Sequence, residues 1–381
     1  MKESTLCVHS GFDTDRNIGG DTGGLGIPVY QTSTYDQEDL SKNQKYDYSR
    51  SGNPTREALE QTIALLEGGK RGCAFGSGIA AIASTLGIFS TGDHLVAAED
   101  IYGGSFRILN TFFKRWGLEV TFVDATDLQA VAGAIRPNTR GLFLETPSNP
   151  LLKITDLRGC CALAREAGII SIVDNTFMSP CLQKPLSLGA DISLHSATKF
   201  LGGHSDAVLG LAVAAEEELG RRIYHVQNSF GAIAGPWDSW LVLRGIKTLK
   251  VRMDYECASA GRLALWLKDH PKVEAVYYPG LPDHPGHDLN ARQAGGAGAV
   301  LSFKTRSREE ALNFFAKTKL AASAVSLGSV ETIASYPVRM SHASMPPAQR
   351  EKLGVTDTLI RLSLGLEDPQ DLIEDFDQAL G

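Results

Sequence analysis

The sequence is short of the features that mark membrane proteins and nucleic-acid-binding proteins. No apolar run approaches the roughly 18 residues that a membrane-spanning helix requires, and residues 1–9 lack the apolar core of a signal peptide. Basic side chains number 37 against 44 acidic ones, which leaves a formal net charge of −7. Because nucleic acids are bound by basic surfaces, this balance argues against such a partner. We expect a cytoplasmic protein that contacts neither a membrane nor a nucleic acid.

Cysteine is scarce and follows no ligand pattern. The six cysteines include no C-x-x-C pair, and the neighbours Cys160 and Cys161 are poorly placed to bridge each other. In a chain of 381 residues this usage predicts reduced thiols. His284 and His287 lie in an expected loop and lack the remaining ligands of a tetrahedral site, so we expect no metal.

Short apolar runs alternate with amphipathic segments from residue 53 onward. Asn53 and Pro54 predict the start of a helix, and Gly68 predicts its end. Strands are predicted at residues 73–75, 94–98, 118–123, 142–144, 169–173, 192–194 and 208–214. Alternating strands and helices require crossover connections. The pattern therefore predicts an α/β fold with a mostly parallel sheet covered on both faces.

Composition divides the chain into three parts. Residues 1–51 are rich in Gly, Thr, Asp and Tyr with weak periodicity, which predicts an extended arm. Residues 52–245 carry the alternating pattern of a cofactor-binding domain. A long helix near residues 240–251 is expected to lead out of this domain. Residues 246–381 then form a smaller C-terminal α/β domain.

Polar residues stand where the predicted strands end. In an open parallel sheet, ligands bind outside the carboxyl ends of the strands. We therefore expect the polar groups at these ends to line one pocket. They lie in residues 76–78, 100–102, 145–149, 174–176 and 195–199.

The segment Gly76-Ser77-Gly78 precedes an apolar helix and is typical of an anion cradle. Glycines allow the backbone to approach a ligand, and the free N–H groups of a helix start favour phosphate. A simple tight turn explains the segment equally well. The segment also fits the dinucleotide pattern G-x-G-x-x-A through Ala81, with Glu99 or Asp100 where a ribose-binding acid would sit. A nicotinamide-dependent oxidoreductase is therefore an alternative class.

Asp174 and Lys199 favour a different cofactor. Asp174 ends one apolar strand, and Lys199 follows another, with Ser196 and Thr198 beside it. Pyridoxal phosphate needs a lysine for its imine, a carboxylate that keeps the ring nitrogen protonated, and amides and hydroxyls for the phosphate. A dehydrogenase has no use for the Asp and Lys pair. The combination predicts a pyridoxal-phosphate enzyme, and it argues against a relic of that fold that only binds or regulates.

Four segments carry a resemblance to a known family. They are Tyr-Asp-Tyr-Ser-Arg-Ser-Gly-Asn-Pro-Thr at 46–55, Asp-Asn-Thr at 174–176, Ser-Ala-Thr-Lys at 196–199 and Arg-Leu-Ser-Leu-Gly-Leu-Glu-Asp at 361–368. With these, nearly the whole chain resembles the Cys/Met-metabolism family of pyridoxal-phosphate enzymes. The resemblance implies the PLP-dependent transferase fold type I, with pyridoxal 5'-phosphate as cofactor. It also implies a homotetramer, a dimer of dimers whose subunits share active sites.

The resemblance further implies roles for individual residues. Lys199 is the Schiff-base lysine and proton carrier, Asp174 pairs with the ring nitrogen, and Tyr102 stacks on the ring and can act as a second catalytic group. The other implied cofactor contacts are Ser77, Gly78, Ile79, Asn149, Thr176, Ser196 and Thr198, with Tyr48 and Arg50 from the neighbouring subunit. Implied substrate contacts are Arg361, which holds the α-carboxylate, with Ser326, Val325, Tyr48, Tyr102 and Asn149.

Three departures from the family's γ-specific members bear on the reaction. Many γ-synthases and γ-lyases carry Glu where this chain has Val325, methionine γ-lyases carry Cys at Gly104, and γ-synthases tend to carry a second Arg at Ser51. These differences favour β-elimination, as in the bacterial cystathionine β-lyases of the family. The expected products from cystathionine are homocysteine, pyruvate and ammonia. A γ-lyase that forms cysteine, 2-oxobutyrate and ammonia, or an enzyme with both activities, is the alternative.

Overall fold

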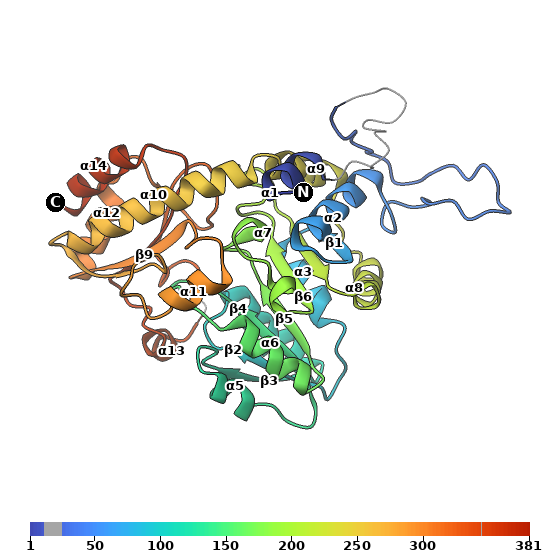
Figure 1. Cartoon of the computed structure of the whole chain (residues 1–381), viewed down its shortest axis with the longest axis horizontal. Helices are drawn as coiled ribbons and strands as arrows, with labels where there is room; N and C mark the ends of the chain where they lie inside the picture. The colour runs from blue at the N-terminus through green and yellow to red at the C-terminus, as the bar shows by residue number, and fades with distance from the viewer. Residues whose placement is uncertain (11–24, 344) are drawn as a thin grey trace.

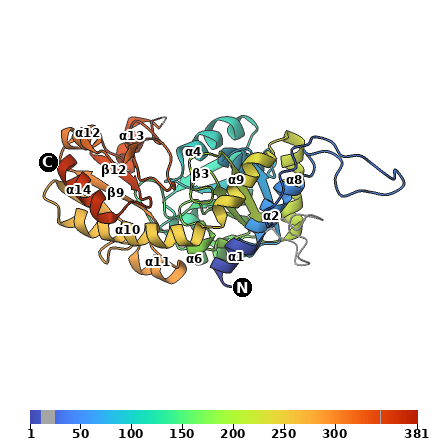
Figure 2. The same cartoon turned by 90° about the horizontal axis from the view of Figure 1, so that it is seen from above.

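The fold contains two β-sheets, each packed with helices around apolar side chains (Figures 1 and 2). The structure is a computed structural model that describes residues 1–10, 25–343 and 345–381. The larger sheet has seven strands, in the spatial order β1-β7-β6-β5-β4-β2-β3. These strands are β1 (Arg71–Phe75), β2 (His94–Ala98), β3 (Glu119–Val123), β4 (Thr139–Glu145), β5 (Ile170–Asp174), β6 (Ile192–Ser196) and β7 (Gly210–Ala214).

The larger sheet is mostly parallel, as predicted. Neighbouring strands from β6 through β5, β4 and β2 to β3 all run in the same direction, and only β7 runs antiparallel between β1 and β6. Each predicted strand is present to within a few residues. In β7, Leu211 and Val213 join one apolar cluster while Ala212 and Ala214 join another, so both faces of the sheet are buried there. Parallel pairing brings the carboxyl ends of β4, β5 and β6 to one edge.

The helix before β1 shows why the local sequence folds as it does. The Asn53 side chain accepts hydrogen bonds from the backbone N–H groups of Thr55 and Arg56, and Pro54 occupies the first turn of α2 (Pro54–Glu67). Gly68 ends the helix in the left-handed conformation, with φ of 76°. Both predicted ends of this helix are confirmed.

The remaining helical segments that precede the smaller sheet in the chain contain between 4 and 21 residues each. They are α1 (Glu3–His9), α3 (Gly78–Leu86), α4 (Gly103–Ile108), the π-helical segment η2 (Leu109–Phe113), α5 (Leu128–Gly133), α6 (Leu157–Glu166), α7 (Ser179–Leu182), the 3₁₀ segment η3 (Pro185–Leu188), α8 (Glu217–Phe230), α9 (Pro236–Ile246) and α10 (Leu249–Asp269).

The single helix expected near residues 240–251 is in fact two, α9 and α10. The Gly245 carbonyl accepts hydrogen bonds from the Thr248 N–H and from the Arg252 guanidinium. These contacts turn the chain between the two helices. Helix α10 then runs along the smaller sheet, as Figure 1 shows.

The smaller sheet has five strands in the order β10-β11-β12-β9-β8 and is antiparallel except for the β10–β11 pair. Its core includes the mutually packed rings of Phe303, Phe314 and Phe376. The predicted boundary between residues 245 and 246 stays a prediction. The elements here are β8 (Val273–Tyr277), α11 (His287–Gln293), β9 (Val300–Thr305), α12 (Arg308–Lys317), β10 (Ala322–Ser323), β11 (Ile333–Ser335), α13 (Pro347–Lys352), β12 (Leu359–Ser363) and α14 (Pro369–Leu380).

The amino-terminal segment only partly resembles the extended arm expected over residues 1–51. Helix α1, which the sequence did not suggest, packs on α2 and α10 of its own chain. Residues 11–24 of the expected arm lie outside the described residues. Residues 25–52 have little regular structure, and Figures 1 and 2 show part of this segment projecting far from the body. Within the described ranges, no helix combines the length and apolar character needed to cross a membrane.

Candidate active site

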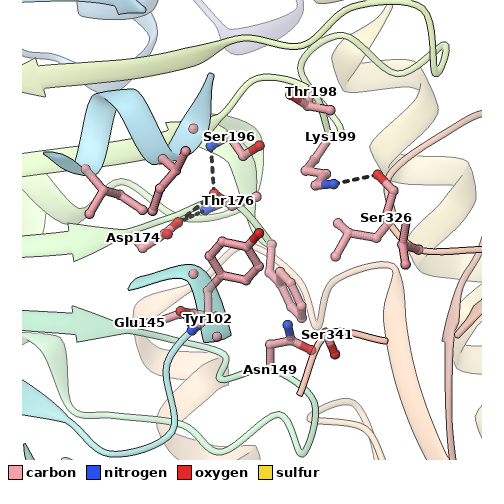
Figure 3. A pocket seen from close by; sticks show the side chains of 18 of the residues that line it. Tyr102, Glu145, Asn149, Asp174, Thr176, Ser196, Thr198, Lys199, Ser326 and Ser341 are labelled. Carbon is pink, nitrogen blue, oxygen red and sulfur yellow. Dashed lines mark hydrogen bonds between the residues drawn. The ribbon is translucent and has the colours of Figure 1, made fainter. Parts of the chain in front are cut away.

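A cavity of about 700 Å³ opens at the edge where β4, β5 and β6 end (Figure 3). Segments far apart in the sequence line it, including the start of α3, the start of α4 and loops of the carboxyl-terminal part. Thirteen of the residues singled out from the sequence lie in its wall: Ser77, Gly78, Ile79, Tyr102, Asn149, Asp174, Thr176, Ser196, Thr198, Lys199, Val325, Ser326 and Arg361. The strand-end residues thus meet as expected.

The start of α3 forms one end of the cavity. The Ser77 side chain caps the helix by accepting a hydrogen bond from the Ala80 N–H. A Cβ atom added at Gly78 would lie 2.9 Å from the Ser196 Cβ, so glycine is required for the helix start to approach β6. The first N–H groups of a helix have no partner within it and carry partial positive charge. This end of the cavity can therefore hold a phosphate.

Asp174, Thr176 and Ser196 connect the ends of β5 and β6. Thr176 donates to Asp174 Oδ1 from its hydroxyl at 2.5 Å and from its backbone N–H at 3.1 Å. The same hydroxyl accepts from the Ser196 N–H at 2.9 Å (Figure 3). Burial raises the pKa of Asp174, and the two bonds from Thr176 oppose that rise. A buried carboxylate held this way suits a cationic partner in the cavity.

Lys199 lies across the cavity from Asp174, as Figure 3 shows, and donates to the Ser326 hydroxyl. Burial and the nearby Arg361 guanidinium lower the pKa of Lys199 to about 8. A larger fraction of this amine is therefore neutral near physiological pH than in an ordinary lysine, and nucleophilic attack and proton abstraction both require the neutral form. Ser326 has φ of 95°, an uncommon backbone conformation for a residue with a side chain.

Arg361, on β12, is almost fully buried beside this lysine. Its guanidinium donates to Asn149 Oδ1 at 3.0 Å, to the Ser326 carbonyl at 2.6 Å and to the Ser335 hydroxyl at 3.2 Å. Its Nε–H finds no acceptor among the described residues. A planar guanidinium with an unused donor is suited to a carboxylate ligand.

Glu145 and Gly104 contact Tyr102. Glu145, at the end of β4 and within the strand-end segment 145–149 expected to line the pocket, accepts a hydrogen bond from the Tyr102 N–H at 2.7 Å. A Cβ atom at Gly104 would lie 2.3 Å from the Tyr102 ring, so a larger residue at this position would displace that ring. The sequence predicted the place of Glu145 in the wall but not its contact with Tyr102.

Other wall residues were not singled out from the sequence as candidate site residues. They include Arg107 on α4, Val208, and Met340 and Ser341 from a loop of the carboxyl-terminal part. Gly103 explains the position of that loop, because a Cβ atom there would lie 2.5 Å from the Ser341 carbonyl oxygen. Such contacts depend on how the two sheets are packed together.

Tyr48 and Arg50 are absent from the wall of this chain's cavity. Arg50 donates to the Asn228 carbonyl and lies over the Tyr48 ring at 5.6 Å. Tyr48 itself is exposed. This placement is compatible with their expected role in a neighbouring subunit, which stays a prediction.

Comparison with known proteins identifies the family. Residues 4–381 match the family described as Cys/Met metabolism PLP-dependent enzyme. The chain belongs to this family. It is 53% identical over 376 residues to cystathionine beta-lyase MetC of Bacillus subtilis (strain 168), covering 99% of this chain and 95% of the relative. It is 50% identical over 380 residues to cystathionine gamma-lyase of the same strain, covering 100% and 99%.

A solved structure shows the same fold. The cystathionine gamma-lyase from Lactobacillus plantarum complexed with L-serine superposes with a TM-score of 0.96 at 43% identity, covering 100% of this chain and 98% of that chain. The expected fold type I is confirmed, and so is dependence on pyridoxal 5'-phosphate. The nicotinamide-dependent alternative, drawn from the glycine pattern at residues 76–81, does not hold.

The cavity of this Cys/Met-family chain fits the cofactor. The glycine-lined start of α3 offers amides to a phosphate, and Asp174 offers a buried carboxylate to a ring nitrogen. Lys199 offers an aldehyde an amine whose pKa is lowered to about 8, so more of it is neutral than in an ordinary lysine. We propose that these groups, with the remaining cavity residues predicted from the sequence, hold the cofactor.

The charge of Arg361 should control the reactivity of Lys199. In the cofactor-free protein, labelling of Lys199 by pyridoxal phosphate should rise with pH around a midpoint near 8, because only the neutral amine attacks the aldehyde. Replacing Arg361→Gln removes a positive charge, so the pKa of Lys199 should rise and the midpoint should move to higher pH. Borohydride reduction and peptide mass spectrometry measure the labelling. Arg107→Gln, also in the cavity wall, is the matched control, and an unmoved midpoint in Arg361→Gln would contradict the assignment.

Proposed function

We propose that this chain is a cystathionine β-lyase, which converts cystathionine and water into homocysteine, pyruvate and ammonia. The carrying observation is that Lys199 and Arg361 share one cavity with Val325, a side chain that is 66% exposed and beside Ser326. The lysine and arginine suit an amino-acid substrate, and the valine offers no charge to a distal ammonium. The relative at 53% identity that is named a cystathionine beta-lyase supports the proposal.

Each polar residue of the cavity has a separate role in the proposed reaction. When bound, pyridoxal phosphate supplies an electron sink for the negative charge left on the substrate α-carbon. Arg361 holds the substrate α-carboxylate and so orients the α-hydrogen toward Lys199. Lys199, in its neutral form, takes that proton. Asp174 would offer its buried carboxylate to the ring nitrogen of the bound cofactor and so keep that nitrogen protonated.

The second half of the reaction breaks the bond between Cβ and sulfur. The bonding electrons leave with sulfur, and Lys199 or Tyr102 supplies the proton that makes homocysteine a neutral thiol. The three-carbon fragment is hydrolysed to pyruvate and ammonia. General acid–base steps of this kind contribute about 10²–10⁴-fold each, so Lys199 is indispensable.

A cystathionine γ-lyase, or an enzyme with both activities, is the second candidate. The observation in its favour is the 50% identity to the relative named cystathionine gamma-lyase. The two reactions share the proton removal by Lys199 and differ in which carbon–sulfur bond breaks. The side chains near the distal half of the substrate, Val325 and Arg107 among them, therefore decide between the two reactions.

We further propose a homotetramer built from two dimers, located in the cytoplasm. Support for shared sites comes from the projecting segment within residues 25–52 and from the position of Tyr48 and Arg50 outside their own cavity. Support for a reducing compartment comes from the cysteines, all of which are free thiols.

The products distinguish the two lyase reactions directly. Purified, cofactor-loaded protein given L-cystathionine should release pyruvate and homocysteine in equal amounts. Mass spectrometry of the quenched reaction measures both products. If 2-oxobutyrate and cysteine dominate instead, the β-lyase proposal is wrong and the γ-lyase candidate takes its place.

Val325→Glu should raise the share of γ-elimination. A carboxylate at this position can bind the distal ammonium of cystathionine and hold the substrate for cleavage of its other carbon–sulfur bond. The ratio of 2-oxobutyrate to pyruvate should increase several-fold, as expected for about 1 kcal/mol from one exposed ion pair. The glutamine of Val325→Gln has the same shape as glutamate but no charge, so this variant should leave the ratio of 2-oxobutyrate to pyruvate near the native value. Equal product ratios in the two variants would contradict the proposal that a charge at position 325 selects the reaction.

Mixing two inactive variants tests the shared site. Arg50→Ala and Lys199→Ala proteins should each be nearly inactive, because one lacks a phosphate contact and the other the catalytic amine. Co-expressed with different affinity tags, they should form hybrids in which one site contains both native residues, and activity should return. Native mass spectrometry verifies the hybrids. Hybrids that stay inactive would show that Arg50 serves the site of its own chain or none.

A further inference from the structure

A buried polar network lies beside Asp174, around the carboxylate of Glu67. Three donors converge on Glu67 Oε1: His195 Nε2 at 2.6 Å, the Ser193 hydroxyl at 3.0 Å and Asn175 Nδ2 at 3.1 Å. The side chains of Glu67 and His195 are 0% and 1% exposed. The network therefore connects the end of α2 to β6 and to the residue that follows Asp174.

The position of Glu67 is costly for a carboxylate. It is the last residue of α2, where the helix dipole disfavours negative charge, and it is removed from water. Its second oxygen, Oε2, has no partner among the described residues. A neutral amide could accept the same bonds at lower cost. A carboxyl group at this position therefore has a use beyond packing.

His195 connects the Glu67 carboxyl group to the cavity. It lies in the cavity wall, directly after Leu194, which pairs in register with Asp174 on the neighbouring strand. With Nε2 engaged by Glu67, Nδ1 is its remaining ring nitrogen, and Nδ1 is buried without a partner among the described residues. A carboxylate that binds one ring nitrogen fixes the orientation of the ring and the identity of the group that the other nitrogen presents.

Thr176, Glu145 and His195 are the groups near Asp174 that affect its charge. Thr176 gives it two hydrogen bonds, and Glu145 pairs with it in register on β4. Burial and the charge of Asp174 raise the pKa of Glu145 well above its usual range, so Glu145 tends to stay neutral. Burial raises the pKa of Asp174, and the two Thr176 bonds and the electrostatic attraction of His195 lower it.

We propose that Glu67 and His195 form a positioning pair that keeps Asp174 anionic opposite the cofactor ring nitrogen. The inference rests on the proposed role of Asp174 in the lyase reaction. The pair contacts neither the substrate nor the reacting atoms and acts through Asp174.

The pair has a defined effect on pH dependence. The attraction from His195 lowers the pKa of Asp174, so the anion persists to lower pH. Removing the attraction raises that pKa, and the anion is then lost at a higher pH as the solution is acidified. The acid limb of kcat should therefore move to higher pH. KM should change little, because Arg361 holds the substrate on the other side of the cavity.

The test compares Glu67→Gln, His195→Gln and the double variant. Each single variant should lower kcat near neutral pH on the order of 10–100-fold, the usual cost of losing an outer-shell partner of this kind. Each should shift the acid limb upward and weaken binding of pyridoxal phosphate, measured by absorbance titration of the cofactor-free protein. Because the two residues act as one unit, the double variant should be no worse than the singles.

Glu256→Gln is the matched control. Glu256 is a buried carboxylate on α10 outside the cavity wall, its oxygens lack partners among the described residues, and burial raises its pKa to about 8. The amide replaces a group that is largely neutral, so the acid limb and cofactor affinity should stay native.

Two outcomes would overturn the pair. One is a folded Glu67→Gln protein with a native acid limb and native cofactor affinity, even with lower thermal stability. The other is a native acid limb in His195→Gln, whose amide can still donate to Glu67 and which decides the question if Glu67→Gln fails to fold. A wrong lyase assignment would instead change the product formed by the native protein and leave the shifts of the acid limb in place.

Discussion

Burying the carboxylate of Asp174 is the constraint on which the site depends. An ion removed from water must be offset by donors placed in advance, and at the end of a strand few backbone groups remain to supply them. Thr176 supplies two bonds, and its hydroxyl also accepts from Ser196. One short turn therefore stabilises the anion and holds β5 to β6, so that the Lys199 segment has a fixed distance from it.

Arg361 and Lys199, on the other side of the cavity, also depend on partners placed in advance. Arg361 is held by acceptors from Asn149, Ser326 and Ser335, so its guanidinium can stay buried without a carboxylate of its own. Its charge then lowers the pKa of Lys199, with burial acting in the same direction. A substrate carboxylate would neutralise Arg361 while the amine acts as a base. Substrate binding and basicity are thus coupled through one pair of side chains.

The residues proposed to decide substrate specificity are held in place less firmly than those proposed to hold the cofactor. The residues proposed to hold the cofactor lie mostly at strand ends and helix starts, whereas Val325, Met340 and Ser341 lie on loops that line the cavity. Loops tolerate substitution because fewer packing contacts hold them. We propose that substitutions at such loop positions separate the two reactions, since relatives named for β- and γ-lyases are similarly identical to this chain.

The sequence by itself determined the helix start at Asn53, the positions of the strands along the chain, and the glycine, Asp174 and Lys199 signals of the cofactor site, because each depends on local pattern or on residue type. It did not predict the interruption between Ile246 and Leu249 that makes two helices of one, where the Arg252 side chain donates to the Gly245 carbonyl. Nor could it find Arg107, Ser341 or the pairing of Glu67 with His195. Residues 67 and 195 are brought to 2.6 Å only when α2 packs on the sheet. Periodicity and motifs record what a residue does for its own segment, whereas contacts between segments are decided by packing in three dimensions.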